Sequence, residues 1–193
     1  MIKEVAESTL KDVSAETSKL PDNVKLSSDV GESAKTGIES IGKRVDPETK
    51  KEIVILRCRN AELAGKRHPE TDVPFVKRII EYGNRLLEGV FPKFPSKFDA
   101  QLPEDALKAS DQKQFQICNN QLKEAVEKNP ELRAQFDEEQ LEQIENGDTP
   151  DGYTWHHDAE VGKMQLVDTE LHQKTGHTGG RAIWGGGTEY RRG

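Results

Sequence analysis

A chain of 193 residues can hold one ordinary domain with a moderate core, or a smaller domain with a tail. Hydrophobic residues make up 33% of it and charged residues another 33%, which favours the second arrangement. No stretch reaches the roughly 18 consecutive apolar residues of a membrane helix, and the first five residues lack the apolar region of a signal peptide. The sequence therefore predicts a soluble protein.

The two cysteines, Cys58 and Cys118, lie far apart and form no Cys-x-x-Cys pair. Neither a disulfide framework nor a thiolate metal site is predicted from them. This cysteine pattern fits a reducing compartment.

The net charge of −7 is unexpected for a protein that handles nucleic acid, so its distribution matters more than its total. Residues 124–148 contain nine acidic side chains against two basic ones, and the rest of the chain is near neutral. Residues 43–97 contain thirteen basic side chains against eight acidic ones. This surplus indicates either a surface for phosphate groups or an ordinary mixed-charge surface.

Residues 1–46 are rich in polar and charged side chains and show no lasting apolar period. We interpret them as a flexible linker or the trimmed end of something larger, so removing residues 1–45 should leave the stability nearly unchanged. The folded domain is predicted over residues 47–193. The apolar run Ile53–Leu56 begins it, as a buried strand or a turn of helix.

Two β-prone runs, Val76–Tyr82 and Arg85–Phe91, flank the dipeptide Gly83-Asn84. A two-residue loop of this kind closes a β-hairpin, which we predict here.

The pattern becomes helical after residue 102. Ser110 or Asp111 can cap a helix that ends at Asn129-Pro130. Its apolar positions recur at steps of three and four and are Phe115, Ile117 or Cys118, Leu122 and Val126. Asp137 can cap a second helix that ends at Gly147, with Leu141 and Ile144 on one side. These helices carry most of the acidic residues, and their simplest role is to pack one stripe and expose the charge to water.

The C-terminal part begins with turn residues at 148–152. We predict two short strands, Tyr153–Asp158 and Met164–Val167. A short helix follows, capped by Asp168 or Thr169 and stopped by Gly176. Residues 178–187 are too rich in glycine for us to expect a regular element.

This strand-turn-strand-helix segment contains four of the five histidines: His156, His157, His172 and His177. Imidazole suits a borderline divalent metal ion, and it can also take a proton from water near neutral pH. Consecutive strand residues point to opposite faces, so His156 and His157 cannot both bind one ion from a regular strand. The pattern predicts one metal ligand, paired with His172 on the helix, and one residue that activates water.

The segment resembles the WHH branch of the HNH/endonuclease VII nucleases, a group of the His-Me finger nucleases found in the toxin domains of bacterial secreted proteins. The resemblance covers roughly residues 57 to 190. Its strongest blocks are Tyr153–His157, Gly162–Val167, Leu171-His172, His177–Gly180 and Trp184-Gly185. A similar lead-in consists of Arg59-Asn60, Gly65–Pro69, Thr71 and Val73–Phe75. The implied fold is α+β, with an N-terminal hairpin, two or three helices and a ββα-metal motif at residues 152–177.

The resemblance implies roles for the histidines. The second residue of the strand pair is the general base in the family and the first is a metal ligand, which gives His157 and His156. His172 lies where the family has its helix ligand. His177 matches a further ligand or a phosphate contact, at a gap of five residues where colicin-type members have four. Asp158 stands where many members have a third histidine.

The implied activity is metal-dependent hydrolysis of phosphodiester bonds, with one divalent ion such as Mg, Zn or Ni. Arg181, Lys174 and Arg59 are candidates for binding phosphate, or are ordinary solvent-facing cations. We expect Trp155 and Trp184 to belong to the core rather than to stack on bases.

We expect non-specific DNA cleavage by a secreted bacterial toxin that enters a target cell, acts in its cytoplasm and is held in check by an immunity protein. The alternatives are an RNase toxin with the same site, a binding module with a histidine-held structural zinc, and a protein whose acidic helices bind a partner.

Overall fold

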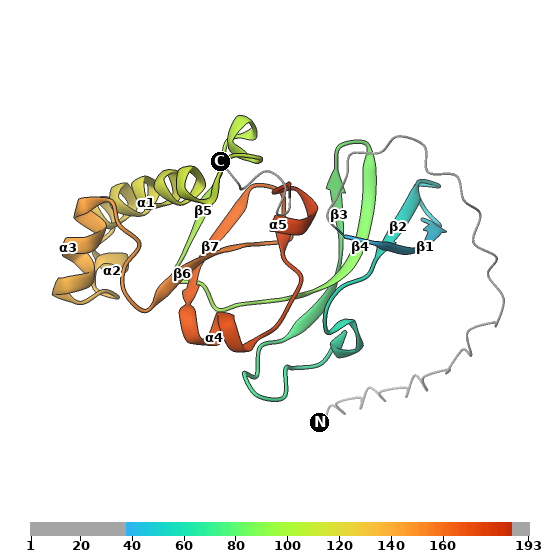
Figure 1. Ribbon diagram of the computed structural model, residues 1–193, viewed down its shortest axis with the longest axis horizontal. Coiled ribbons are helices and arrows are strands. Elements are labelled where there is room, and N and C mark those ends of the chain that lie inside the picture. The colour runs from blue at the N-terminus through green and yellow to red at the C-terminus, as the bar shows by residue number, and fades with distance from the viewer. Residues whose placement is uncertain (1–37, 187–193) are drawn as a thin grey trace, which may run out of the picture. The chain divides into compact units, whose positions relative to one another are not determined.

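The computed structural model describes residues 38–186 and shows the predicted α+β fold, with five α-helices and two β-sheets in that range (Figure 1). The first sheet has the strand order β1-β2-β4-β3, in which β2 and β4 are parallel and the other pairs antiparallel. Its strands are β1 (Ser40–Val45), β2 (Glu52–Leu56), β3 (Phe75–Tyr82) and β4 (Arg85–Pro92). The run at 53–56 is thus a strand and not a helical turn.

The predicted hairpin is confirmed. β3 and β4 pair in antiparallel register from Phe75↔Pro92 to Tyr82↔Arg85, leaving Gly83-Asn84 as the loop. Gly83 has a φ of 59°, a conformation that glycine adopts without steric cost.

Strand β1 lies within the segment that we expected to be a tail. It pairs with β2, and the Arg44 guanidinium donates to the buried Glu88 carboxylate on β4 at 2.6 Å. These contacts place Ser40–Val45 in the sheet. The sequence did not predict this strand, because a short strand gains its stability from neighbouring strands rather than from its own composition. Removal of residues 1–45 would therefore destroy an edge strand. The predicted tail up to residue 37 lies outside the described residues.

The second sheet carries the predicted strand-turn-strand-helix segment. It is antiparallel, with the strand order β5-β7-β6, and consists of β5 (Phe98–Gln101), β6 (Tyr153–His157) and β7 (Lys163–Asp168). Helix α4 (Thr169–Lys174) follows β7 directly, and the Asp168 carboxylate caps it by accepting from the Leu171 N–H. The ββα unit expected at residues 152–177 is present.

The helical region contains α1 (Asp111–Lys128), α2 (Pro130–Arg133) and α3 (Glu138–Asn146). Ser110 caps α1, and Asp137 forms a capping box with Gln140 at the start of α3. The nine acidic side chains between residues 124 and 148 are all exposed, as expected. The buried residues of α1 are Gln114, Cys118, Asn119, Leu122 and Val126. This stripe packs in one core with Phe91, Trp155, Leu166 and Trp184.

The expectation of no regular element beyond residue 178 is wrong, because Gly180–Ile183 form the short helix α5. Gly180 lets two groups meet there: a Cβ at this position would overlap the Asp158 carbonyl and the Trp184 indole. The Trp184 Nε1 donates to that carbonyl at 2.9 Å. The close approach of the Asp158 main chain thus explains why position 180 is a glycine, although glycine-rich composition by itself suggests irregular structure. Trp155 and Trp184 are both buried, as predicted.

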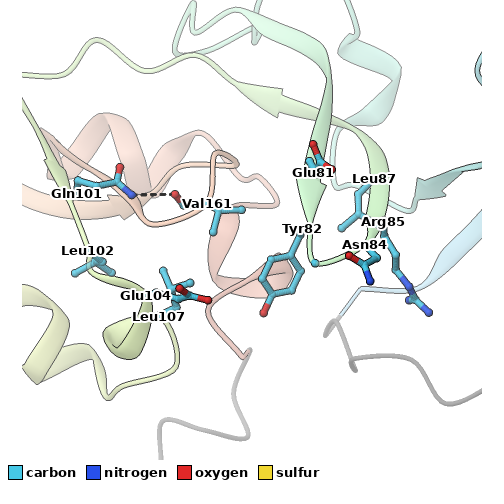
Figure 2. A pocket seen from close by; sticks show the side chains of 11 residues that line it. Glu81, Tyr82, Asn84, Arg85, Leu87, Gln101, Leu102, Glu104, Leu107 and Val161 are labelled. Carbon is cyan, nitrogen blue, oxygen red and sulfur yellow. Dashed lines mark hydrogen bonds between the residues drawn. The ribbon is translucent and has the colours of Figure 1, made fainter. Parts of the chain in front are cut away.

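A pocket of about 580 Å³ lies between the hairpin loop and the segment around the 3-10 helix Glu104–Ala106 (Figure 2). Tyr82, Leu102, Leu107 and Val161 form its apolar wall. It contains no histidine and lies apart from the residues predicted to carry chemistry. Within residues 38–186, no helix combines the length and the apolar character needed to cross a membrane.

Candidate functional site

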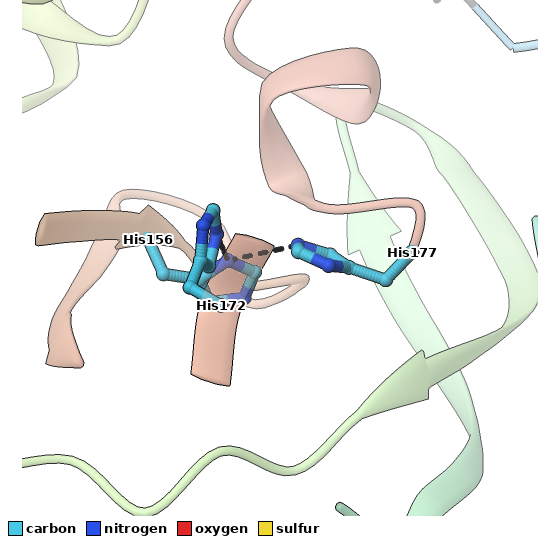
Figure 3. A group of neighbouring side chains, drawn as sticks. All are labelled: His156, His172 and His177. Carbon is cyan, nitrogen blue, oxygen red and sulfur yellow. Dashed lines mark hydrogen bonds between the residues drawn. The ribbon is translucent and has the colours of Figure 1, made fainter. Parts of the chain in front are cut away.

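Three histidines from three different segments converge beside strand β6 (Figure 3). His156 comes from β6, His172 from α4, and His177 from the loop after α4. The Nδ1 of His156 lies 3.2 Å from the Nε2 of His172 and 3.2 Å from the Nε2 of His177. One nitrogen of each ring lies within 4.8 Å of the others.

The donor set fits a small divalent ion. Nitrogens at about 2.0–2.1 Å from a tetrahedral ion are separated by roughly 3.3 Å, close to the two spacings seen here. The Nδ1 of His177 donates to the Thr175 carbonyl at 3.1 Å, which leaves the lone pair of that ring on Nε2. Phe94 packs against all three rings, with centroids 4.8, 5.4 and 5.1 Å away. The triad therefore has an apolar support on one side, and one nitrogen of each ring lies in a common cluster.

Burial keeps these rings neutral, the form that binds metal. It lowers the pKa of His156 well below its usual value, with a further contribution from the neighbouring His177. Burial also lowers the pKa of His172. Burial and the neighbouring His172 lower the pKa of His177 to about 4. At neutral pH the three side chains are acceptors with available lone pairs.

The gap of five residues between His172 and His177 is compatible with a shared site. Helix α4 ends at Lys174, so His177 need not lie on the same helical face as His172. Asn60 holds the intervening loop by donating from Nδ2 to the Gly176 carbonyl at 2.5 Å. The Arg59 N–H donates to the Thr178 Oγ1 at 2.9 Å. The lead-in segment thus fixes the loop that carries His177.

His157 points away from the triad, as strand alternation predicts. Its ring is buried next to Trp184, with the centroids 5.4 Å apart. Its Nε2 lies 2.8 Å from the Gln114 Oε1 on α1 and 4.0 Å from the Asp111 Oδ1. Burial, reinforced by the positive charge of Arg181, lowers the pKa of His157 to about 3. The ring is therefore a neutral proton acceptor at neutral pH.

The contacts of His157 with Gln114 and Asp111 were not predicted from the sequence. Gln114 has no exposed surface and lies four residues before Cys118 on the buried stripe of α1. A polar residue at a core position of a helix is the signal that could have found it, because a buried amide needs partners. No sequence pattern indicates that one of these partners is His157, 43 positions away.

The three predicted phosphate-binding cations lie in different settings. Arg181 lines the histidine cleft and forms an ion pair with Asp111 at 3.2 Å. The Arg59 guanidinium packs over Gly176, and its charge contributes to the lowered pKa of His177. Lys174 is exposed on α4 and forms an ion pair with Glu170. Lys174 does not line the cleft, and its contact is that of an ordinary surface cation.

Asp158, directly after the histidine pair, has structural contacts. Its carboxylate accepts from Arg78 on β3 at 2.9 and 3.0 Å, and its carbonyl accepts from Trp184. It thus ties the end of β6 to the first sheet and to the loop after α5.

The cleft around the histidines has a volume of about 850 Å³. His156, His157, His172 and His177 all line it, together with Asp111, Phe115 and Arg181. The triad and His157 therefore border the same cleft, although the two groups have different contacts. Such a combination of a buried imidazole and a three-nitrogen site is typical of hydrolytic metalloenzymes.

One family model matches the part of the chain that contains this cleft. Residues 84–179, just under half of the chain, match the family described as the DNase/tRNase domain of colicin-like bacteriocin. The matched range includes α1, the ββα unit and all four histidines of the cleft, and it supports a nuclease toxin domain. No curated protein and no solved structure matches the chain.

Proposed function

We propose that this chain is a metal-dependent endonuclease of the HNH type, WHH branch, that hydrolyses phosphodiester bonds as a bacterial toxin. The observation that carries the proposal is that two adjacent histidines of one strand have different surroundings. His156 joins the triad on one side of β6, and His157 faces helix α1 on the other. A neutral base beside a metal site is one arrangement that can hydrolyse a phosphodiester.

In this proposal His156, His172 and His177 hold one divalent ion, Mg, Zn or Ni. When bound there, it would supply a positive charge for the phosphate group and the leaving oxygen. His157, whose ring is unprotonated at neutral pH, removes a proton from the attacking water. Arg181, at the edge of the cleft, binds a neighbouring phosphate of the substrate once it separates from Asp111.

DNA is the substrate we favour, and cleavage without sequence selectivity is expected because residues 38–186 contain no evident base-reading element around the cleft. The matched family description names both DNases and tRNases, so RNA cleavage by the same site is the second candidate. A 3′ leaving oxygen next to the metal site would produce 5′ phosphate ends.

The remaining parts of the proposal concern the setting of the toxin. The colicin-like match supports delivery into a target cell. The proposal adds that the toxin acts in the cytoplasm of that cell and that a dedicated immunity protein protects the producing cell. A histidine-held structural zinc is less well supported, because the triad supplies three ligands and a closed structural site uses four.

Purified protein incubated with plasmid DNA, total RNA and tRNA, with each metal and with chelator, tests the proposal. We expect plasmid cleavage that needs metal and stops with chelator, while circular dichroism shows an intact fold. Cleavage of RNA with intact plasmid would assign the protein to the RNases. Unfolding on chelation, without cleavage of any substrate, would favour the structural zinc.

A further inference from the structure

Helix α1 contributes a buried amide to the histidine that we propose as the general base. Gln114, fully buried near the start of α1, places its Oε1 2.8 Å from the Nε2 of His157. Either group can act as donor or acceptor in such a contact, because an amide can be turned over and an imidazole has two tautomers. The other partners of Gln114 decide which arrangement is present.

The amide of Gln114 is held in one orientation by the main chain. Its Nε2 lies 2.9 Å from the Ala106 carbonyl and 2.8 Å from the Leu107 carbonyl, at the end of the 3-10 helix. Both carbonyls are acceptors only, so the NH₂ group must face them. The turned-over amide would place oxygen against two oxygens in a buried site, at a large electrostatic cost. The Gln114 Oε1 therefore faces His157.

An acceptor at this position requires a proton on the Nε2 of His157. The Asp111 carboxylate, whose Oδ1 lies 4.0 Å from the same nitrogen, favours the same tautomer. A neutral imidazole with a proton on Nε2 carries its lone pair on Nδ1. Two acceptors from the first turn of α1 thus select one of the two forms of the ring.

We propose that Gln114 is a positioning residue that fixes His157 in the Nε2–H tautomer, so that Nδ1 is the nitrogen that receives the proton from water. The transfer of a proton from water to Nδ1 rests on the proposed function, whereas the assignment of the tautomer rests on geometry alone. The carbonyls of Ala106 and Leu107 contribute to this positioning, because they fix the orientation of the Gln114 amide that contacts the His157 ring. Helix α1 then has a function in catalysis beyond core packing.

The first test needs no substitution. Histidine labelled with ¹⁵N, in the full chain at pH 7 with chelator, distinguishes protonated from unprotonated ring nitrogens by their chemical shifts, and His157→Ala identifies the His157 signals. We expect Nε2 to be protonated and Nδ1 unprotonated. A ring with its proton on Nδ1 would overturn the proposal.

The second test removes the acceptor. Gln114→Met preserves length and removes both amide functions, so the His157 signals should change to a mixture of tautomers. The turnover rate should fall about tenfold to a hundredfold, the usual effect of losing the partner that orients a functional histidine, while KM for DNA and metal affinity stay near wild type. Gln121→Met is the matched control. Gln121 lies on the same helix and makes two hydrogen bonds to the Gln101 main chain, so it should change neither the signals nor the rate.

The outcomes distinguish the positioning role of Gln114 from the proposed nuclease function. A Gln114→Met protein that keeps the wild-type tautomer and turnover rate would overturn the positioning role, even if DNA cleavage is established. A wild-type protein that cleaves no nucleic acid would refute the proposed function, and the ring signals would still decide the tautomer assignment.

Discussion

The carboxylate of Asp111 lies 3.2 Å from the guanidinium of Arg181, at the edge of the cleft that contains the four histidines. Asp111 begins helix α1 and Arg181 lies on helix α5, so the ion pair joins two elements that flank His157. If Arg181 binds a substrate phosphate as proposed, the phosphate would compete with Asp111 for the Arg181 guanidinium.

Substitution at the two positions should have opposite effects on binding. Arg181→Ala should weaken DNA binding and reduce its salt dependence by about one counterion, because one phosphate contact is lost. Asp111→Asn should strengthen binding, because it releases Arg181 and removes a negative charge. Fluorescence anisotropy with labelled DNA and chelator measures both changes without cleavage. Arg133→Ala, on the exposed side of α2, is the control. Equal affinities for all four proteins would argue against phosphate binding by Arg181.

The two adjacent histidines should give distinct defects. His157→Ala should lower the cleavage rate by roughly 10² to 10⁴-fold, the usual contribution of a positioned proton acceptor, with metal affinity near wild type by calorimetry. His156→Ala and His172→Ala each remove a nitrogen from the triad, so metal affinity itself should fall. Added metal should restore part of their rate but none of the rate of His157→Ala. The opposite pattern at residues 156 and 157 would exchange their roles.

The metal-free protein should lose stability as the pH falls below about 6.5. The folded-state pKa values of His157 and His177 are about 3 and about 4, while an unfolded histidine titrates near 6.5. Between these values the unfolded chain binds more protons than the folded one, so acid favours unfolding. The buried His157 alone accounts for about 1.4 kcal/mol per pH unit.

Thermal melts between pH 7 and pH 5 isolate this effect, because most carboxylates titrate at lower pH. The melting temperature should fall steadily over that range and fall less in His157→Ala. A melting temperature that stays constant down to pH 5 would show that the histidines are not buried in their neutral form.

Two glycines near the site should respond differently to alanine. A Cβ at Gly180 would overlap main-chain and indole atoms that cannot move, so Gly180→Ala should cost ~3 kcal/mol of folding free energy. The three atoms nearest to a Cβ at Gly176 would all belong to the end of the flexible Arg59 side chain. Gly176→Ala should therefore cost less than about 1 kcal/mol, because the guanidinium can move aside. Urea denaturation of both variants checks the order, and a larger loss for Gly176→Ala would contradict it.

Local sequence determined much of the fold. Gly83-Asn84 between two β-prone runs predicted the hairpin, and Ser110, Asp137 and Gly147 predicted the ends of helices, because turns and caps are decided by residues a few positions apart. The alternation of a strand also predicted that His156 and His157 would separate. These features needed no knowledge of distant parts of the chain.

Tertiary structure alone decided the rest. Ser40–Val45 has the composition of a polar tail but is a strand because it pairs with β2. Gly180–Ile183 forms a helix that packs closely on the Asp158 carbonyl and on Trp184, which the absence of a side chain at Gly180 permits. Likewise, Asn60 fixes the loop of His177 from 116 residues away, and Gln114 reaches His157 across 43 residues. Such contacts depend on how distant elements pack against one another. Periodicity, caps and turn residues report only interactions between residues that are close in the sequence. The sequence alone indicated the histidines, and the packing of α1 against β6 determined which nitrogen of His157 faces Gln114.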